Sequence, residues 1–165
     1  MNPYLWLTSV SGLTLLSLIL YKKTKKEFFS NPKTRFVKPS KAQAWLLADP
    51  DGYISSMSSA DLHARQVLSP YEYRLKSSLS VLEINSYHQH RLLQAVKKAN
   101  EFFKTYRNFY LDPSIHQFPW WFVFTNGSYE EGLPHTRGKY IFLTPKTLEQ
   151  SMDQLVITLI HEKIH

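Results

Sequence analysis

Four apolar segments in the second half of the chain constrain its fold most strongly. Between residues 87 and 107, apolar residues recur every three or four positions, which predicts one long amphipathic helix. Residues 120–125 (WWFVFT) and 140–143 (YIFL) are rich in aromatic and β-branched residues, which is typical of buried strands. A second apolar stripe predicts a final helix from residue 147 to the end. We therefore expect an α+β domain over residues 48–165, with the order helix–strand–strand–helix and the helices packed on a sheet.

Two shorter helices are predicted upstream of this core. The first of them is expected to start from Ser58. The second is expected to begin after Ser69, because Ser69 as cap and Glu72 three residues later form a capping box. Pro70 at the first helical position supports the same start. The segment SYEEGLPHTRG (128–138) is rich in turn residues and predicts a loop.

The final helix ends in the spacing H-E-x-x-H, formed by His161, Glu162 and His165. Two residues four positions apart are neighbours on one face of a helix, so both imidazoles can reach one metal ion. The buried stripe of this helix is expected to lie on a different face. It consists of Leu148, Met152, Leu155, Val156, Leu159 and Ile160.

This spacing suits zinc catalysis. A catalytic zinc site keeps one position open for water and lowers the pKa of that water toward about 7. A carboxylate beside the water can then act as a general base. The sequence therefore predicts His161 and His165 as Zn²⁺ ligands and Glu162 as the catalytic base. The competing interpretation is a solvated helix end with two surface histidines.

The order of elements and the HEKIH motif resemble the zincin-type zinc metallopeptidases over residues 87–165. This resemblance implies hydrolysis of peptide bonds. It also implies that a peptide substrate lies along the strand before the motif helix, contacting Tyr140, Ile141 and Phe142. The motif is similar as well to membrane-anchored zinc-peptidase-like proteins predicted in large DNA viruses, which would make this a viral protein.

The resemblance leaves the third zinc ligand open, because zincins take it from a position downstream of the motif. We expect the domain to be truncated at its C-terminus, with that ligand in a longer protein. Among upstream residues His135 is the preferred candidate. The other upstream candidates are His116, Glu130 and Glu131.

The first twenty-one residues carry no charged side chain and are followed directly by a basic run. Their length and composition predict a transmembrane anchor over 1–21 rather than a cleaved signal peptide, whose charges would come first. A buried core helix is the other alternative. Residues 22–47 then form a basic tether. We expect four lysines to lie at the membrane surface, with a short N-terminus across the membrane and the bulk of the chain on the cytoplasmic (or virion-interior) side. These lysines are Lys22, Lys23, Lys25 and Lys26.

The net charge of +7 is confined to one segment. Residues 22–41 hold eight Lys or Arg against Glu27 alone, so the rest of the chain is neutral in sum. Because nucleic-acid-binding domains spread basic residues over a folded face, we expect no nucleic-acid partner. The chain has no cysteine, which excludes disulfides and Cys-ligated zinc.

Two other functions are consistent with the same features. One is a non-catalytic, membrane-associated structural or scaffold protein, such as a virion assembly component, with an incomplete peptidase fold. The other is a peripheral lipid-binding module that uses residues 22–41.

Overall fold

The computed structural model describes residues 34–105 and 115–165, the side chain of His116 excepted, and these belong to one compact unit, Lys33–His165. A mixed five-stranded sheet forms its centre, with four strands in the order β1-β3-β5-β4 and β2 paired to β3. β1 and β5 run parallel to β3, whereas β2 is antiparallel to β3 and β4 is antiparallel to β5. The strands are β1 (Thr34–Phe36), β2 (Val81–Leu82), β3 (Trp120–Thr125), β4 (His135–Arg137) and β5 (Tyr140–Leu143).

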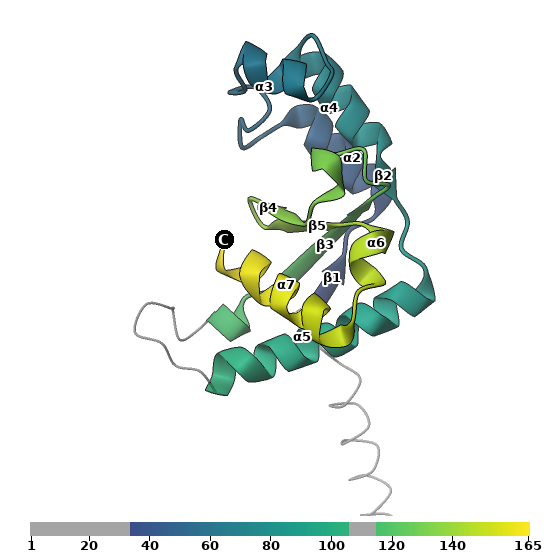
Figure 1. Cartoon of the computed structure of the whole chain (residues 1–165), viewed down its shortest axis with the longest axis vertical. Helices are drawn as coiled ribbons and strands as arrows, with labels where there is room; N and C mark the ends of the chain where they lie inside the picture. The colour runs from purple at the N-terminus through teal and green to yellow at the C-terminus, as the bar shows by residue number, and fades with distance from the viewer. Residues whose placement is uncertain (1–33, 106–114) are drawn as a thin grey trace, which may run out of the picture. The chain divides into compact units, whose positions relative to one another are not determined.

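Helices cover both faces of this sheet. Figure 1 shows α2, α3 and α4 on one side of the strands and α5, α6 and α7 on the other. The first group comprises α2 (Pro39–Ala48), α3 (Ser59–Ala64) and α4 (Pro70–Leu79). The second comprises α5 (Ser86–Thr105), α6 (Pro145–Leu148) and α7 (Met152–Ile164). Two short 3₁₀ turns, η1 (Ile115–Gln117) and η2 (Glu130–Gly132), flank β3 and β4.

The alternation of side chains along β3 and β5 produces two cores. Trp120, Phe122 and Phe124 join the core that faces α5 and α7, whereas Val123 joins the core that faces α2 and α4. Successive residues of a strand point to opposite faces, so a strand covered on both sides has to be apolar almost throughout. This double burial explains the near-continuous apolar sequences of β3 and β5.

The long elements agree with their sequence patterns. β3 and β5 occupy the two predicted strands, and α5 occupies the predicted long helix. The predicted cap at Ser69 is also confirmed, since its hydroxyl accepts from the Glu72 amide. The structure adds a cap at Ser58, whose hydroxyl accepts from the Asp61 amide.

The predicted tether, in contrast, extends too far into the chain. Residues 34–47, predicted as part of the tether, form β1 and all but the last residue of α2 in the folded unit. Pro39 stands in the first turn of α2, where proline is tolerated because the missing N–H would have no helical partner. β1 has only three residues, too few for a periodic pattern.

The prediction of a transmembrane helix ahead of a four-element domain is wrong as a fold description. Within residues 34–105 and 115–165, no helix combines the length and the apolar composition needed to cross a membrane. α5 has 20 residues, but one of its faces carries charged side chains. The predicted anchor at 1–21 and the lysines at 22–26 lie outside the described residues. The prediction of a mixed α and β domain is confirmed. The domain has more strands and helices than the sequence pattern indicated.

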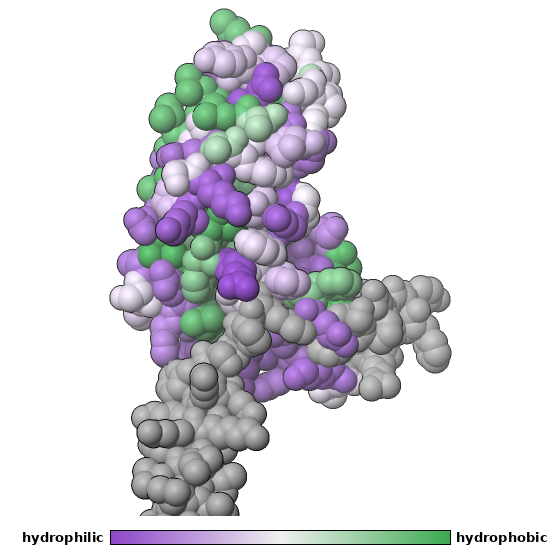
Figure 2. Space-filling model, turned by 180° about the vertical axis from the view of Figure 1, so that it is seen from behind, coloured by the Kyte–Doolittle hydropathy of each residue, from purple (hydrophilic) through white to green (hydrophobic). Residues whose placement is uncertain are grey.

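One apolar helix face stays exposed in this unit. Large hydrophobic side chains on and just before α4 are accessible, and Figure 2 shows hydrophobic surface in this region when the molecule is seen from behind. They are Leu68, Tyr71, Leu75 and Leu79.

Candidate metal-binding motif on helix α7

Helix α7 places the histidine motif next to the last strand of the sheet. Its first turn is capped by the Ser151 hydroxyl, which accepts from the Gln154 amide. Leu155 and Leu159 are fully buried against α5 and the sheet, so this stripe fixes the rotation of the helix. The C-terminal end of α7 lies beside β4, as Figure 1 shows.

The two histidines of the motif converge on one point in space. His161 and His165 are both exposed, and their Nε2 atoms lie 3.1 Å apart. Two imidazole nitrogens bound at about 2.0–2.1 Å to one tetrahedral zinc ion would be about 3.3 Å apart. In the absence of metal the same contact is an N–H···N hydrogen bond with one ring as donor. The pair therefore already has the spacing of two ligands of a single ion.

Glu162, between these histidines, points toward the sheet. Its side chain is buried, and the Thr136 hydroxyl on β4 lies 2.8 Å from its carboxylate Oε2. The same hydroxyl lies 2.8 Å from the Glu162 backbone carbonyl, and its single hydrogen serves one acceptor at a time. This contact ties the end of α7 to β4 and holds the carboxylate in one place.

Lys163 attaches the same helical turn to the start of β3. Its ammonium group donates to the backbone carbonyls of Phe118 and Pro119, each at 3.0 Å. It also lies 4.6 Å from the ring centroid of Trp120. The last turn of α7 is thus held on two sides, by Thr136 and by Lys163, while the histidines face solvent.

The preferred third ligand, His135, is not brought to the histidine pair. Thr136 faces α7, so its neighbour His135 faces the other side of the sheet, where its ring stacks on Phe142 with centroids 4.9 Å apart. Its Nδ1 lies 2.9 Å from the Leu133 carbonyl. Burial lowers the pKa of His135 below its ordinary value, which keeps the ring neutral and suited to this apolar position.

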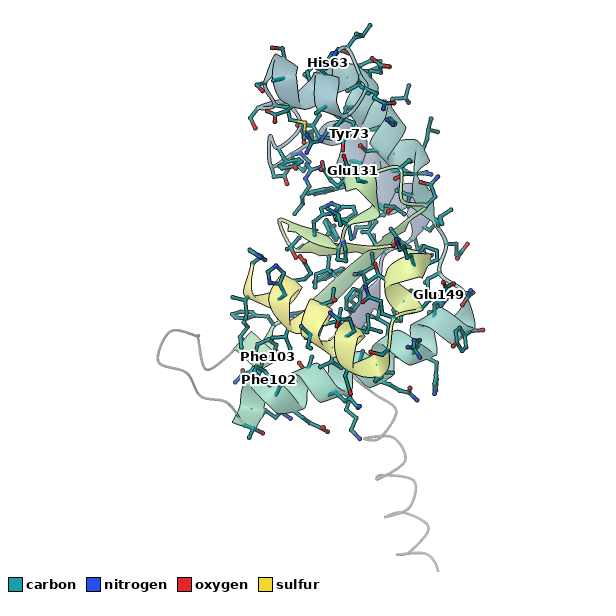
Figure 3. All side chains as sticks on the ribbon, in the orientation of Figure 1. His63, Tyr73, Phe102, Phe103, Glu131 and Glu149 are labelled. Carbon is teal, nitrogen blue, oxygen red and sulfur yellow. The ribbon has the colours of Figure 1, made fainter. Side chains whose placement is uncertain are left out.

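The acidic candidates are also remote from the pair. Glu130 is engaged by Arg65 at 2.7 Å and by the hydroxyl of Tyr73 at 2.9 Å. Figure 3 shows Glu131 and Tyr73 on the side of the sheet opposite to α7. The side chain of His116 lies outside the described residues. In the described ranges, no cluster of three or more His, Cys, Asp or Glu is arranged to hold a metal ion.

The predicted substrate strand is interior rather than at the edge. β5 is paired on both sides, with β3 and with β4, and Tyr140, Ile141 and Phe142 are buried. Its backbone groups are therefore already used, so β5 has no free edge along which a peptide could add as a strand. The terminal strand on this side is β4, which the sequence pattern had placed within a loop.

A buried ionic cluster on the other face of β4 fixes the position of this strand. Arg137 lies 2.7 Å from Asp49 and 2.5 Å from Asp51, and it donates to the Tyr129 hydroxyl at 2.6 Å. Burial alone would raise the pKa of Asp49, but hydrogen bonds from Ser55 and Ile54 and the charge of Arg137 lower it below its ordinary value. The cluster joins β4 to the segment that follows α2.

Sequence reasoning missed Thr136, the residue that holds the Glu162 carboxylate. Its signal was weak, because β4 has only three residues and is followed by Gly138, whose positive φ of 55° forms the turn into β5. A polar–glycine turn before an apolar strand indicates a hairpin, but not which residue faces the helix.

No protein-family model matches the sequence, and comparisons with curated proteins and with solved structures likewise found no match.

Proposed function

We propose that this chain contributes a zinc-binding half-site to a peptide hydrolase of the metallopeptidase type. His161 and His165 would bind Zn²⁺, and Glu162 would act as the general base. The observation that carries the proposal is the 3.1 Å separation of the two Nε2 atoms on one exposed helix face. The same separation fits an N–H···N hydrogen bond between the two rings, so zinc binding by the pair is the property to measure.

Zn²⁺ bound at this pair would supply a water of lowered pKa as the nucleophile. Glu162 would take the proton of that water and pass it to the leaving amine. Thr136 would orient the carboxylate through its hydroxyl, 2.8 Å away. The outer edge of β4 offers backbone groups to an extended peptide, which can bind as an added strand.

The described residues supply two of the three protein ligands of a catalytic zinc site, so the proposal needs a third ligand from outside the described ranges. This shortfall favours a second candidate function, a non-catalytic structural protein in which α7 serves only packing. In that case the role of Glu162 would be its contact with Thr136, and the two histidines would bind no metal ion.

Peptide hydrolysis by the Glu162→Gln variant separates these functions. Glutamine keeps the size of the side chain and can still accept from Thr136, so the fold should persist while the base is lost. We expect zinc-dependent cleavage of a quenched fluorescent peptide library to fall on the order of 100-fold or more. Glu149→Gln, at the exposed position that follows α6 and is labelled in Figure 3, is the matched control and should keep full activity.

Zinc-dependent cleavage that is unchanged in Glu162→Gln would remove Glu162 from the chemistry. A wild-type chain that binds zinc at the pair but cleaves no peptide would favour the structural function.

A further inference from the structure

A cluster of basic side chains surrounds Trp121 on the side of the sheet opposite to α7. The ammonium group of Lys139, in the β4–β5 turn, lies 4.7 Å from the Trp121 ring centroid. The ammonium group of Lys41, on α2, lies 5.8 Å from the same centroid. Arg35 on β1 is paired in register with Trp121, and all three cations are exposed. We call Arg35, Lys41, Lys139 and Trp121 the basic patch.

The basic patch has no acidic counterpart in the elements that build it. Neither residues 34–48, nor 118–125, nor 133–148 contain an Asp or Glu. Arg137 is nearby in sequence, but Asp49 and Asp51 neutralise it. Among the described residues, no ion pair joins a carboxylate to the three cations of the patch.

The start of α2 adds to the positive potential. This helix has no acidic residue in its first turn and no side-chain cap at Lys38, so the partial positive charge of its N-terminus is not compensated there. Lys41 belongs to this turn. Like charges held close together without counterions favour the binding of an anionic partner.

We propose that the basic patch binds an anionic lipid surface. Its cations would contact the phosphate and carboxylate groups of the lipid heads. Positive charge in the chain also continues immediately before β1, where residues 22–33 hold five lysines against Glu27. Lipid head groups present diffuse negative charge to such a surface, and the Trp121 ring holds Lys41 and Lys139 close together at its centre. The inference is independent of the proposed zinc chemistry, since the patch and the histidine pair lie on opposite faces of the sheet.

Single-stranded nucleic acid fits the basic patch less well. Proteins of that class stack bases on exposed aromatic rings. Trp121 is partly buried against the second core, and its ring is already contacted by two lysines and by Tyr140, whose centroid lies 6.3 Å away. The ring therefore supports the cations rather than offering a free stacking face.

The test is co-sedimentation of the full chain with vesicles of phosphatidylcholine, with and without about a third phosphatidylserine. Lys41→Gln combined with Lys139→Gln should weaken binding to the anionic vesicles about tenfold or more at low salt, because each basic side chain near such a surface contributes measurably. Lys104→Gln combined with Lys146→Gln removes the same charge from exposed positions on α5 and α6 and should change binding less than about twofold.

Hydrogen exchange gives a second, local readout. Anionic vesicles should protect the β4–β5 turn around Gly138 and the first turn of α2, and neutral vesicles should not. Equal losses in the two double variants, or no protection of these segments, would overturn the assignment. Tighter binding of single-stranded RNA than of anionic vesicles, lost in the Lys41/Lys139 variant, would also overturn it in favour of a nucleic-acid partner.

Discussion

The polar side chains on the two faces of β4 differ in burial and in pairing. On one face Arg137 is buried, and its guanidinium group is bound by the carboxylates of Asp49 and Asp51 and by the Tyr129 hydroxyl. On the other, Thr136 contacts Glu162, and the neighbouring histidines of α7 are exposed with their ring nitrogens directed at each other. A charge cluster that is fully paired holds a fold together, whereas ligand atoms that converge without a third partner are available for binding. The difference makes the α7 face the side on which the proposed zinc binding is to be tested.

The largest effect should come from breaking the paired face. Arg137→Met leaves the buried Asp49 without its cation and should lower the free energy of unfolding by about 3–5 kcal/mol. Urea unfolding followed by circular dichroism measures this. Lys146→Met, at an exposed position of α6, is the control and should change stability by less than about 0.5 kcal/mol. A loss below about 1 kcal/mol in Arg137→Met would mean that the cluster does not hold β4 in place.

A smaller effect is expected from Thr136 on the opposite face. Thr136→Val keeps the shape but removes the hydroxyl that donates to Glu162, leaving a buried carboxylate with one partner fewer. The expected loss of stability is about 1–3 kcal/mol, measured by the same unfolding curve.

Thr136→Ser restores the hydroxyl and should recover most of this stability. Equal losses in the serine and valine variants would contradict this account, because serine keeps the hydroxyl that donates to Glu162 and valine does not.

The sequence predicted those elements whose pattern is long enough to repeat. α5 spans 20 residues and shows several turns of helical periodicity, and β3 and β5 are continuous apolar runs. β1 and β4 have three residues each, so neither alternation nor propensity could distinguish them from a loop. The interior position of β5 could not be predicted for a related reason, because pairing between strands depends on contacts distant in sequence.

The motif residues were predictable for a different reason. The spacing of His161 and His165 is a local property of any helix, so their convergence follows once the helix forms. The position of His135 depends instead on the register of β4 against β5, where His135 pairs with Phe142. A strand reverses the direction of its side chains at every residue, so an error of one position in a three-residue strand changes the face entirely.

Calorimetric titration of the purified full chain with Zn²⁺ near neutral pH tests most directly whether the α7 histidines bind a metal ion. The account predicts one ion bound per chain, with affinity weakened on the order of 100-fold by His161→Ala and by His165→Ala. His63→Ala, at an exposed position of α3, is the matched control and should bind zinc as the wild type does. An absence of zinc binding, or equal binding in all four proteins, would contradict the central claim that the α7 histidines form a metal-binding pair.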